Sequence, residues 1–161
     1  MNNARRRAHC THMKHISIEP ATVDSAAECA AVFRTTRQFS LAYLPCLHTA
    51  DEDALFLAER VFGVDTVAVA LDETRRVVGF IAFRDGWVNH LYVLPGFQGL
   101  GVGARLLGEA KREWASLRLW TFERNTGARR FYEREGFSII GRTDGAQNEE
   151  REPDLLLQWT R

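Results

Sequence analysis

A glycine-rich turn is the segment of this sequence whose residue types are best suited to chemistry. Residues 98–104 read QGLGVGA and lie between a stretch that predicts a strand and one that predicts a helix. Glycines lack a Cβ atom, so several backbone N–H groups can point at one centre. At the beginning of a helix these groups lack helical partners and favour an anion. The turn therefore predicts a phosphate site, and close packing of the helix on a sheet is the alternative.

A dinucleotide-binding turn is one interpretation of these glycines. Gly99, Gly101 and Ala104 match the pattern G-x-G-x-x-A, and Glu123 follows roughly 20 residues further on. The order of elements argues against a nucleotide-dependent oxidoreductase. The turn begins only at residue 98, after sequence that favours hairpins, and the 161-residue chain leaves too little room after Glu123 for further βαβ units.

The stretches around the turn predict one α/β (α+β) domain over residues 15–161, after a flexible tail at 1–14. Apolar periodicity predicts helices, with Thr22 or Asp24 able to cap the first, and β-rich runs predict strands. The strands are expected at 15–19, 66–71, 77–83, 87–93, 117–122, 137–140 and 154–159, and the helices at 23–38, 51–62, 101–115 and 126–135. Hairpins mixed with crossovers predict a mixed, mostly antiparallel sheet of about seven strands flanked by about four helices.

Two motifs in this order resemble those of the GNAT (GCN5-related) N-acetyltransferase superfamily. The first, Q/R-x-x-G-x-G/A after a strand, is present as Gln98, Gly101 and Gly103. The second runs from Asn125 through Ala128 and the FYE sequence at 131–133 to GF at 136–137. The resemblance spans roughly residues 15–160. It implies a GNAT-type acyl-CoA N-acyltransferase domain that uses acetyl-CoA as acyl donor and no metal.

The resemblance also implies which residues bind the acyl donor. The backbone of Leu91, Tyr92 and Val93 would pair with the pantetheine arm as an added strand does. Asn125 would bond the pantetheine or cap its own helix. The pyrophosphate would lie on the amides of the turn, which are those of Gln98, Gly99, Leu100, Gly101, Val102 and Gly103, with Ala104 opening the helix.

Tyr132 and His90 are the candidate catalytic residues. Tyr132 matches the family tyrosine that protonates the leaving thiolate, and packing on Phe131 is its alternative role. An alkylammonium has a pKa of about 10, so a base must remove a proton near neutral pH. Many relatives use a glutamate on the central strand, where this sequence has Trp87. His90 is the nearest titratable residue; a packing histidine, with water or loop carboxylates as the base, is the alternative.

Two segments are expected to hold the acceptor amine. Residues 39–53 offer an apolar wall with a polar group, and residues 143–154 carry five carboxylates against Arg151, enough to attract a cation. A solvated acidic loop is the alternative interpretation. The candidate substrate-binding residues are Tyr43, His48, Asp144, Glu149 and Glu150.

Composition excludes several other classes of protein. Lys plus Arg and Asp plus Glu both number 21, which disfavours a general nucleic-acid binder. No run approaches the ~20 apolar residues of a membrane span. The three cysteines are few and widely spaced, which predicts a cytoplasmic protein rather than a disulfide framework.

The first 14 residues contain no apolar stretch of the kind found in secretory signals. His9, Cys10, His12 and His15 could form a soft-metal cluster, although nothing nearby would impose a coordination geometry, and no metal is expected.

The leading hypothesis is an N-acetyltransferase, a monomer or homodimer, that acetylates a primary amine of a small molecule, peptide or protein N-terminus. The amine would attack directly in a ternary complex. The alternative is a non-catalytic acyl-CoA-binding or regulatory module of the same fold, since the strand glutamate is missing.

Overall fold

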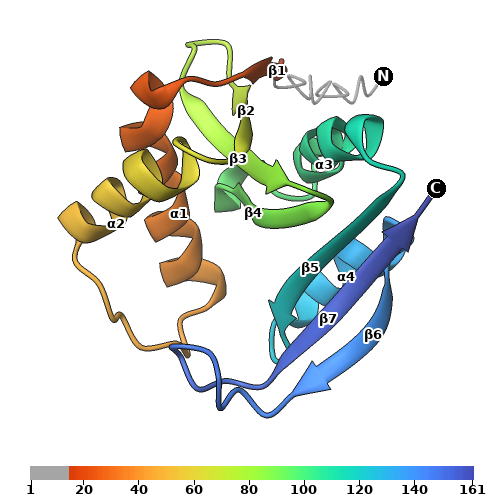
Figure 1. Ribbon diagram of the computed structural model, residues 1–161. Coiled ribbons are helices and arrows are strands. Elements are labelled where there is room, and N and C mark those ends of the chain that lie inside the picture. Colours follow the sequence, from red (N-terminus) through yellow and green to blue (C-terminus); the bar gives the residue numbers. More distant parts are fainter. Residues whose placement is uncertain (1–14) are drawn as a thin grey trace, which may run out of the picture.

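The computed structural model describes residues 15–161, so His9, Cys10 and His12 of the possible metal cluster lie outside the described residues. One seven-stranded sheet has the order β1-β2-β3-β4-β5-β7-β6, and within it only β4 and β5 pair in parallel (Figure 1). The strands are β1 (Ser17–Pro20), β2 (Thr66–Leu71), β3 (Val77–Arg84), β4 (Trp87–Val93), β5 (Ser116–Phe122), β6 (Ser138–Thr143) and β7 (Asp154–Thr160), and the α-helices are α1 (Ala26–Ser40), α2 (Ala50–Phe56), α3 (Val102–Glu113) and α4 (Thr126–Arg134). The expected fold class and element order are confirmed.

The sheet is covered by helices on both faces, which explains the apolar character of its central strands. In β2, Val67 and Val69 face α1 and α2, whereas Ala68 and Ala70 face α3. The two sides of β3 are likewise divided between these two cores, so it is apolar almost throughout. Helices α3 and α4 lie on the same face, and their apolar residues share one core.

The beginnings of the first two helices differ from the prediction. A 3-10 turn at Val23–Ser25 precedes α1, and neither Thr22 nor Asp24 caps it through a side chain, so the predicted cap is wrong. Helix α2 instead begins with a capping box, in which Thr49 and Glu52 exchange hydrogen bonds of 2.7 and 3.2 Å. It continues into a π-helical turn at Leu57–Val61.

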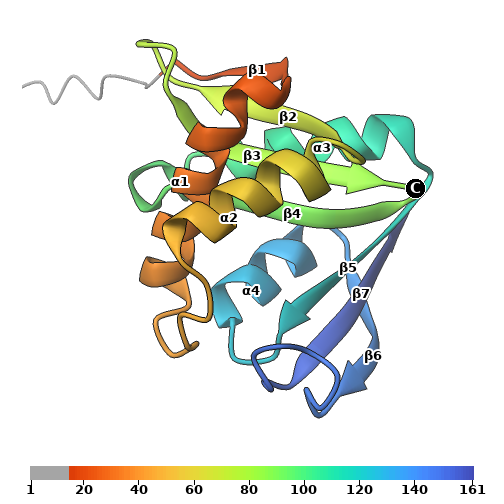
Figure 2. The ribbon, with the colours of Figure 1, turned by 60° about the vertical axis from the view of Figure 1, so that its left-hand side comes forward.

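The most consequential feature of the sheet is the separation of β4 from β5. The two strands pair only at Trp87 and Arg118, where the Arg118 N–H donates to Gly86 O at 2.8 Å. On its other edge β4 pairs with β3, where His90 is opposite Ala82 and Val88 is opposite Phe83. Asn89 therefore has no partner in β3 and forms a bulge. Bulges increase local twist and bend a strand. Beyond this point β4 and β5 diverge, and the sheet opens as a V (Figure 2).

Candidate active site

The glycine-rich turn adopts a backbone conformation that requires glycine at two positions. Gly99 and Gly101 have φ angles of 73° and 79°, in the left-handed region that other residues rarely adopt. Gly101 immediately precedes α3, so the amides of Val102, Gly103 and Ala104 belong to the first helical turn and have no helical acceptor. These observations agree with the predicted anion site.

Gly103 has a different role in the same turn. A Cβ atom on this residue would lie 3.2 Å from Cζ of Phe131, closer than ordinary van der Waals contact. Its absence allows α3 to approach α4. Close packing therefore applies at Gly103, whereas Gly99 and Gly101 set the backbone conformation of the turn, and its use as a phosphate site stays a prediction.

A hollow of about 640 Å³, here called the turn cleft, lies between the glycine-rich turn, β4 and α4. It brings together ten of the predicted residues: Leu91, Tyr92, Val93, Gln98, Gly99, Gly101, Gly103, Ala104, Asn125 and Tyr132. The side chain of Leu100 is exposed and that of Val102 is in the core, so only their amides could serve. Asn125 Oδ1 accepts the Ala128 N–H at 3.2 Å and so caps α4.

One edge of β4 faces the turn cleft. The Leu94 N–H donates to Val78 O at 2.8 Å, and bonding alternates along an antiparallel pair. The backbone groups of Leu91 and Val93 therefore point away from β3, toward the opening of the V. The Val93 carbonyl accepts a hydrogen bond from Gln98 Nε2 at 2.8 Å, which connects the turn to the end of β4. The rest of this edge could pair with an extended ligand.

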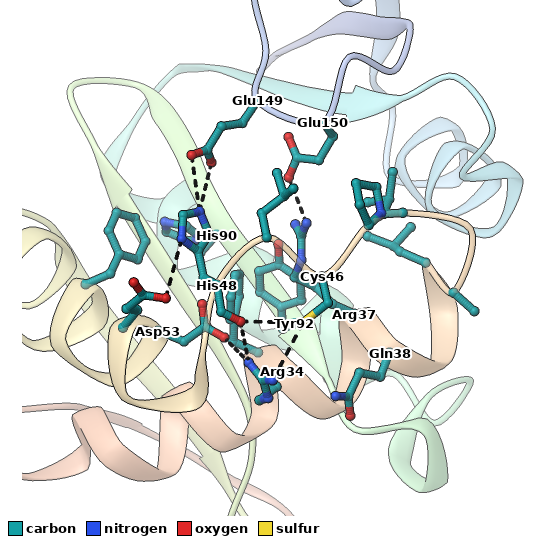
Figure 3. Close-up of a pocket in the computed structure, with 18 of the residues that line it drawn as sticks. Arg34, Arg37, Gln38, Cys46, His48, Asp53, His90, Tyr92, Glu149 and Glu150 are labelled. Atoms are coloured by element: carbon teal, nitrogen blue, oxygen red, sulfur yellow. Dashed lines mark hydrogen bonds and ion pairs between the residues drawn. The ribbon is translucent and has the colours of Figure 1, made fainter.

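A second hollow of about 630 Å³, here called the ion-pair cleft, lies on the α1–α2 side (Figure 3). Three ion pairs of 3.1 Å or less line it. Arg34 pairs with Asp53 at 2.8 Å, Arg37 with Glu150 at 2.7 Å, and His48 with Glu149 at 3.1 Å. The structure thus brings together the predicted residues His48, Glu149 and Glu150. Sequence reasoning missed Arg34, Arg37 and Asp53; one available signal was the three-residue spacing of the arginines on one helix.

Two predicted acceptor residues lie elsewhere. The Tyr43 ring lies under the Arg124 guanidinium, 4.2 Å from its carbon to the ring centroid, and Tyr43 does not line the ion-pair cleft. The Asp144 carboxylate accepts the Ala146 N–H within its own turn at 2.9 Å and does not line the cleft either. Tyr43 and Asp144 therefore do not share the ion-pair cleft with His48, and their role in acceptor binding stays a prediction.

The surroundings of the acidic loop, residues 143–154, are less negative than the charges of the loop residues alone. Glu150 is paired with Arg37, and Glu152 is paired with Arg124 at 3.1 Å. The predicted excess of five carboxylates over one guanidinium therefore does not describe the surroundings of the loop. The ion-pair cleft itself retains an acidic balance, with four carboxylates against two guanidinium groups.

His90 faces the ion-pair cleft from β4, inside an aromatic enclosure. The centroids of Phe33, Phe56 and Phe80 lie 6.2, 5.8 and 6.4 Å from its own. Burial lowers the His90 pKa to about 4, against a smaller opposing effect of the Asp65 carboxylate. Its Nδ1 atom is buried and has no hydrogen-bond partner among residues 15–161. His90 is therefore a neutral imidazole near pH 7.

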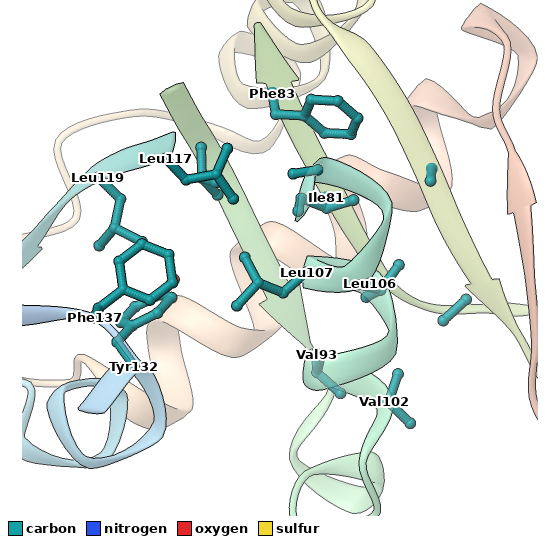
Figure 4. Packing of buried hydrophobic residues seen from close by; sticks show 14 of the residues in the cluster. Ile81, Phe83, Val93, Val102, Leu106, Leu107, Leu117, Leu119, Tyr132 and Phe137 are labelled. Atoms are coloured by element: carbon teal, nitrogen blue, oxygen red, sulfur yellow. The ribbon is translucent and has the colours of Figure 1, made fainter. Parts of the chain in front are cut away.

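Tyr132 lies where the two halves of the sheet separate. It contacts Phe131 edge-on, with ring centroids 5.1 Å apart. It also contacts Phe137 edge-on, with ring centroids 5.4 Å apart (Figure 4). It lines both the turn cleft and a cavity of about 140 Å³ between β4 and β5, here called the junction cavity. Burial raises the Tyr132 pKa, and the nearby Tyr92 phenol raises it further. Tyr132 therefore carries its proton near pH 7, as a general acid must.

Residues 15–161 contain no group of three or more His, Cys, Asp or Glu side chains placed to hold a metal ion. The same part of the chain has no helix with the length and apolarity that crossing a bilayer demands. Cys29 is buried, which raises its thiol pKa to about 12, and Cys46 is exposed beside Arg34.

Comparison with known proteins supports the same conclusion as the motifs. The acetyltransferase (GNAT) domain model matches residues 63–139. An uncharacterised N-acetyltransferase of Mycobacterium bovis is 36% identical over 76 residues, 41% of this chain and 49% of that protein. One from Archaeoglobus fulgidus is 35% identical over 95 residues, 56% and 63% of the two chains. The chain thus spans about half the length of the mycobacterial relative that it matches.

Solved structures share the fold over nearly the whole chain. Apo YjaB from Escherichia coli is 25% identical, with a TM-score of 0.77 over 90% of this chain and 97% of that one. The PaiA N-acetyltransferase of Thermoplasma acidophilum, solved with coenzyme A, is 18% identical, with a TM-score of 0.70 over 91% and 99% of the two chains. Together with the two motifs, these similarities show that the chain contains a GNAT acetyltransferase domain and has the fold of GNAT acetyltransferases over nearly its whole length.

Proposed function

We propose that this protein is an acetyl-CoA-dependent N-acetyltransferase in which an amine attacks the thioester directly in a ternary complex. The proposal rests on the meeting of the two clefts in the opening between β4 and β5. Tyr92 lines the ion-pair cleft, the junction cavity and the turn cleft. A thioester held along β4 would therefore be within reach of an amine in the ion-pair cleft.

The residues of the turn cleft fit an extended ligand that ends in a diphosphate. The unpaired amides before and within the first turn of α3 suit the pyrophosphate of coenzyme A. The open edge of β4 at Leu91 and Val93 suits the amides of pantetheine, in the manner of strand addition. Acetyl-CoA supplies the activated acyl group, and the protein supplies placement and proton transfer.

Tyr132 and His90 would handle the two protons of the reaction. The amine nitrogen bonds to the carbonyl carbon, the carbon–sulfur bond breaks, and the Tyr132 O–H protonates the thiolate. His90 is unprotonated near pH 7 and can accept the proton of the amine. Because its pKa is low, His90 holds that proton only briefly. Water or the carboxylates of the ion-pair cleft, such as Glu149, would take it away.

The ion-pair cleft favours an acceptor that is a cationic amine on an apolar body. Its four carboxylates outnumber its two guanidinium groups, which attracts a cation and disfavours a carboxylate-bearing acceptor. Phe33 and Phe56 supply apolar and aromatic surface next to His90. Amines without a carboxylate should therefore be better acceptors than free amino acids.

A non-catalytic acyl-CoA-binding module is the second candidate function. Two observations favour it: Trp87 stands where many relatives have a glutamate, and the low pKa of His90 makes it a weak base. Such a protein would bind acetyl-CoA through the same turn cleft without transferring the acetyl group to any amine.

Two measurements distinguish these functions. Titration calorimetry compares acetyl-CoA with NAD, and a thiol-release assay screens polyamines, aminoglycosides, amino acids and peptide N-termini. Acetyl-CoA binding with amine-dependent thiol release supports the enzyme, whereas binding without release from any amine supports the module. NAD binding without acetyl-CoA binding would overturn both.

A further inference from the structure

Tyr92 occupies a position that its predicted role as a strand residue does not explain. Among residues 15–161, only Leu41 and Tyr92 line the ion-pair cleft, the junction cavity and the turn cleft together. Of these two, only Tyr92 carries a polar side chain. Its aromatic ring lies edge-on to Phe33, with centroids 5.0 Å apart. A phenol O–H is therefore present where donor and acceptor would meet.

Arg37 fixes the surroundings of this phenol. Its Nη2 atom lies 2.7 Å from Glu150 Oε1, and its guanidinium carbon lies 5.3 Å from the Phe33 ring centroid. The side chains of Arg37 and Glu150 are only 24% and 15% exposed, so this pair is well shielded from water. Arg37 also interacts with the Tyr92 phenol, and these three residues are neighbours in the cleft (Figure 3). A positive charge beside a phenol oxygen makes its O–H a stronger hydrogen-bond donor.

Burial keeps the phenol in its protonated form. It raises the pKa of Tyr92, and the guanidinium of Arg37 only partly opposes this effect. Tyr92 therefore donates a hydrogen bond near pH 7 rather than acting as a base. Tyr132 is a further phenol coupled electrostatically to Tyr92 across the same opening. Two protonated phenols thus lie near the expected position of the thioester.

We propose that Tyr92 is a further catalytic residue, whose O–H donates a hydrogen bond to the thioester carbonyl oxygen as that oxygen becomes negative. This inference rests on the proposed acetyltransferase function. When the amine lone pair forms the new C–N bond, the C=O π electrons move to the oxygen and are stabilised by Tyr92. When they return, the C–S bond breaks and Tyr132 gives its proton to the sulfur. Arg37 is a positioning residue that acts through Tyr92.

The test is Tyr92→Phe, which removes the hydroxyl and keeps the ring that packs on Phe33. Removal of one donor to an oxyanion lowers kcat by about 10²- to 10³-fold. We expect a loss in this range with the best amine found by screening, whereas the dissociation constant of acetyl-CoA and the melting temperature stay close to those of the wild type. The pH profile should keep its shape, because a hydrogen-bond donor that stays protonated adds no titration step.

Arg37 variants separate positioning from simple support of the fold. Arg37→Lys keeps a positive charge near Tyr92 and should retain more kcat than Arg37→Gln, with similar melting temperatures for the two variants. In the Tyr92→Phe background the difference in kcat between them should disappear, since Arg37 acts through the phenol. A difference that persists without the hydroxyl contradicts this role.

The failure of this inference is distinguishable from failure of the proposed function. If wild-type protein releases thiol and Tyr92→Phe does so with kcat within about threefold, the role of Tyr92 is overturned and the function stands. A change in the pH profile on Tyr92→Phe likewise overturns the donor role. If wild-type protein binds acetyl-CoA but releases no thiol with any amine, the proposed function fails, and the inference fails with it.

Discussion

The Nε2 atom of His48 lies 3.1 Å from Oε2 of Glu149, although 101 positions separate the two residues in the chain. This pair joins the connection between α1 and α2 to the connection between β6 and β7, at the ion-pair cleft (Figure 3). Nδ1 of His48 faces a second carboxylate, that of Glu52, at 4.0 Å. The charge of His48 therefore controls how strongly Glu149 can attract a cationic acceptor.

The His48 pair predicts a pH dependence of acceptor binding. The hydrogen bond to Glu149 raises the His48 pKa above its usual value of about 6.5. A raised pKa in the folded state means that the bridge is fully formed below the unfolded value and is lost as pH rises through the folded value. Glu149 is then released, so we expect the KM of a cationic acceptor to fall across this window. Steady-state kinetics from about pH 6 to about pH 9 measures the change.

His48→Gln is the control for this effect, since it removes the titrating group and keeps a polar side chain of moderate size. In this variant the fall in KM attributed to His48 should disappear, while any contribution from deprotonation of the amine itself remains. Identical KM profiles in the wild type and the variant would contradict the role assigned to the bridge.

Substitution of Gly101 should disable binding of acetyl-CoA. Asp at this position would have to adopt a φ of 79° and would place a carboxylate beside the amides expected to hold phosphate. We expect Gly101→Asp to weaken acetyl-CoA binding by at least about tenfold, which is about 1.4 kcal/mol. Titration calorimetry measures this loss. Gly108→Ala, within α3 and away from the turn, is the matched control, and unchanged affinity in Gly101→Asp argues against the phosphate site.

Removal of the Tyr132 hydroxyl should affect turnover more than binding. Its raised pKa keeps the phenol protonated near pH 7, so it is ready to protonate the thiolate. A positioned general acid contributes about 10²- to 10⁴-fold, so we expect Tyr132→Phe to lower kcat within this range. The dissociation constant of acetyl-CoA should change little. The rate of thiol release at saturating acetyl-CoA measures kcat, and a wild-type kcat in the variant would exclude the acid role.

A methyl group at Gly103 should destabilise the fold. The added carbon would lie 3.2 Å from Cζ of Phe131, so α3 and α4 would have to move apart. Overpacking of this kind costs about 1 to 3 kcal/mol, and we expect Gly103→Ala to lower the free energy of unfolding by this amount. At Gly108 the nearest atom is the flexible end of Arg112 at 3.8 Å, so Gly108→Ala should be neutral or stabilising. Urea denaturation compares the two, and equal stabilities would exclude close packing at Gly103.

The strands and helices around the active site could be predicted well because their signals are local. The strands at 66–71 and 87–93 have the predicted bounds, since a β-rich run is a signal that acts within a few residues. The first turn of α1 could not be predicted, because a capping residue such as Thr22 marks a helix entry without excluding a 3-10 turn. The bulge at Asn89 has no signal in its residue type, since it is visible only in how β4 pairs with β3.

The acceptor side was predicted less completely, and Tyr43 and Asp144 show why. Both are in the expected loops, but Tyr43 lies under Arg124 and Asp144 folds back on its own turn. Loop residues have no periodicity that reveals the direction of a side chain. Ion pairs such as Arg37 with Glu150 join residues 113 positions apart. No spacing rule in the sequence predicts which of these distant residues pair.

The sequence by itself determined the glycine conformation of the turn, the order of the elements and the two motifs, because these depend on backbone sterics and on spacing over a few residues. Tertiary structure alone decided that β4 separates from β5, that Tyr92 joins two clefts, and that two of the five carboxylates of the acidic loop pair with arginines. These properties depend on which distant surfaces pack together, and that outcome minimises the free energy of the whole chain rather than of any segment.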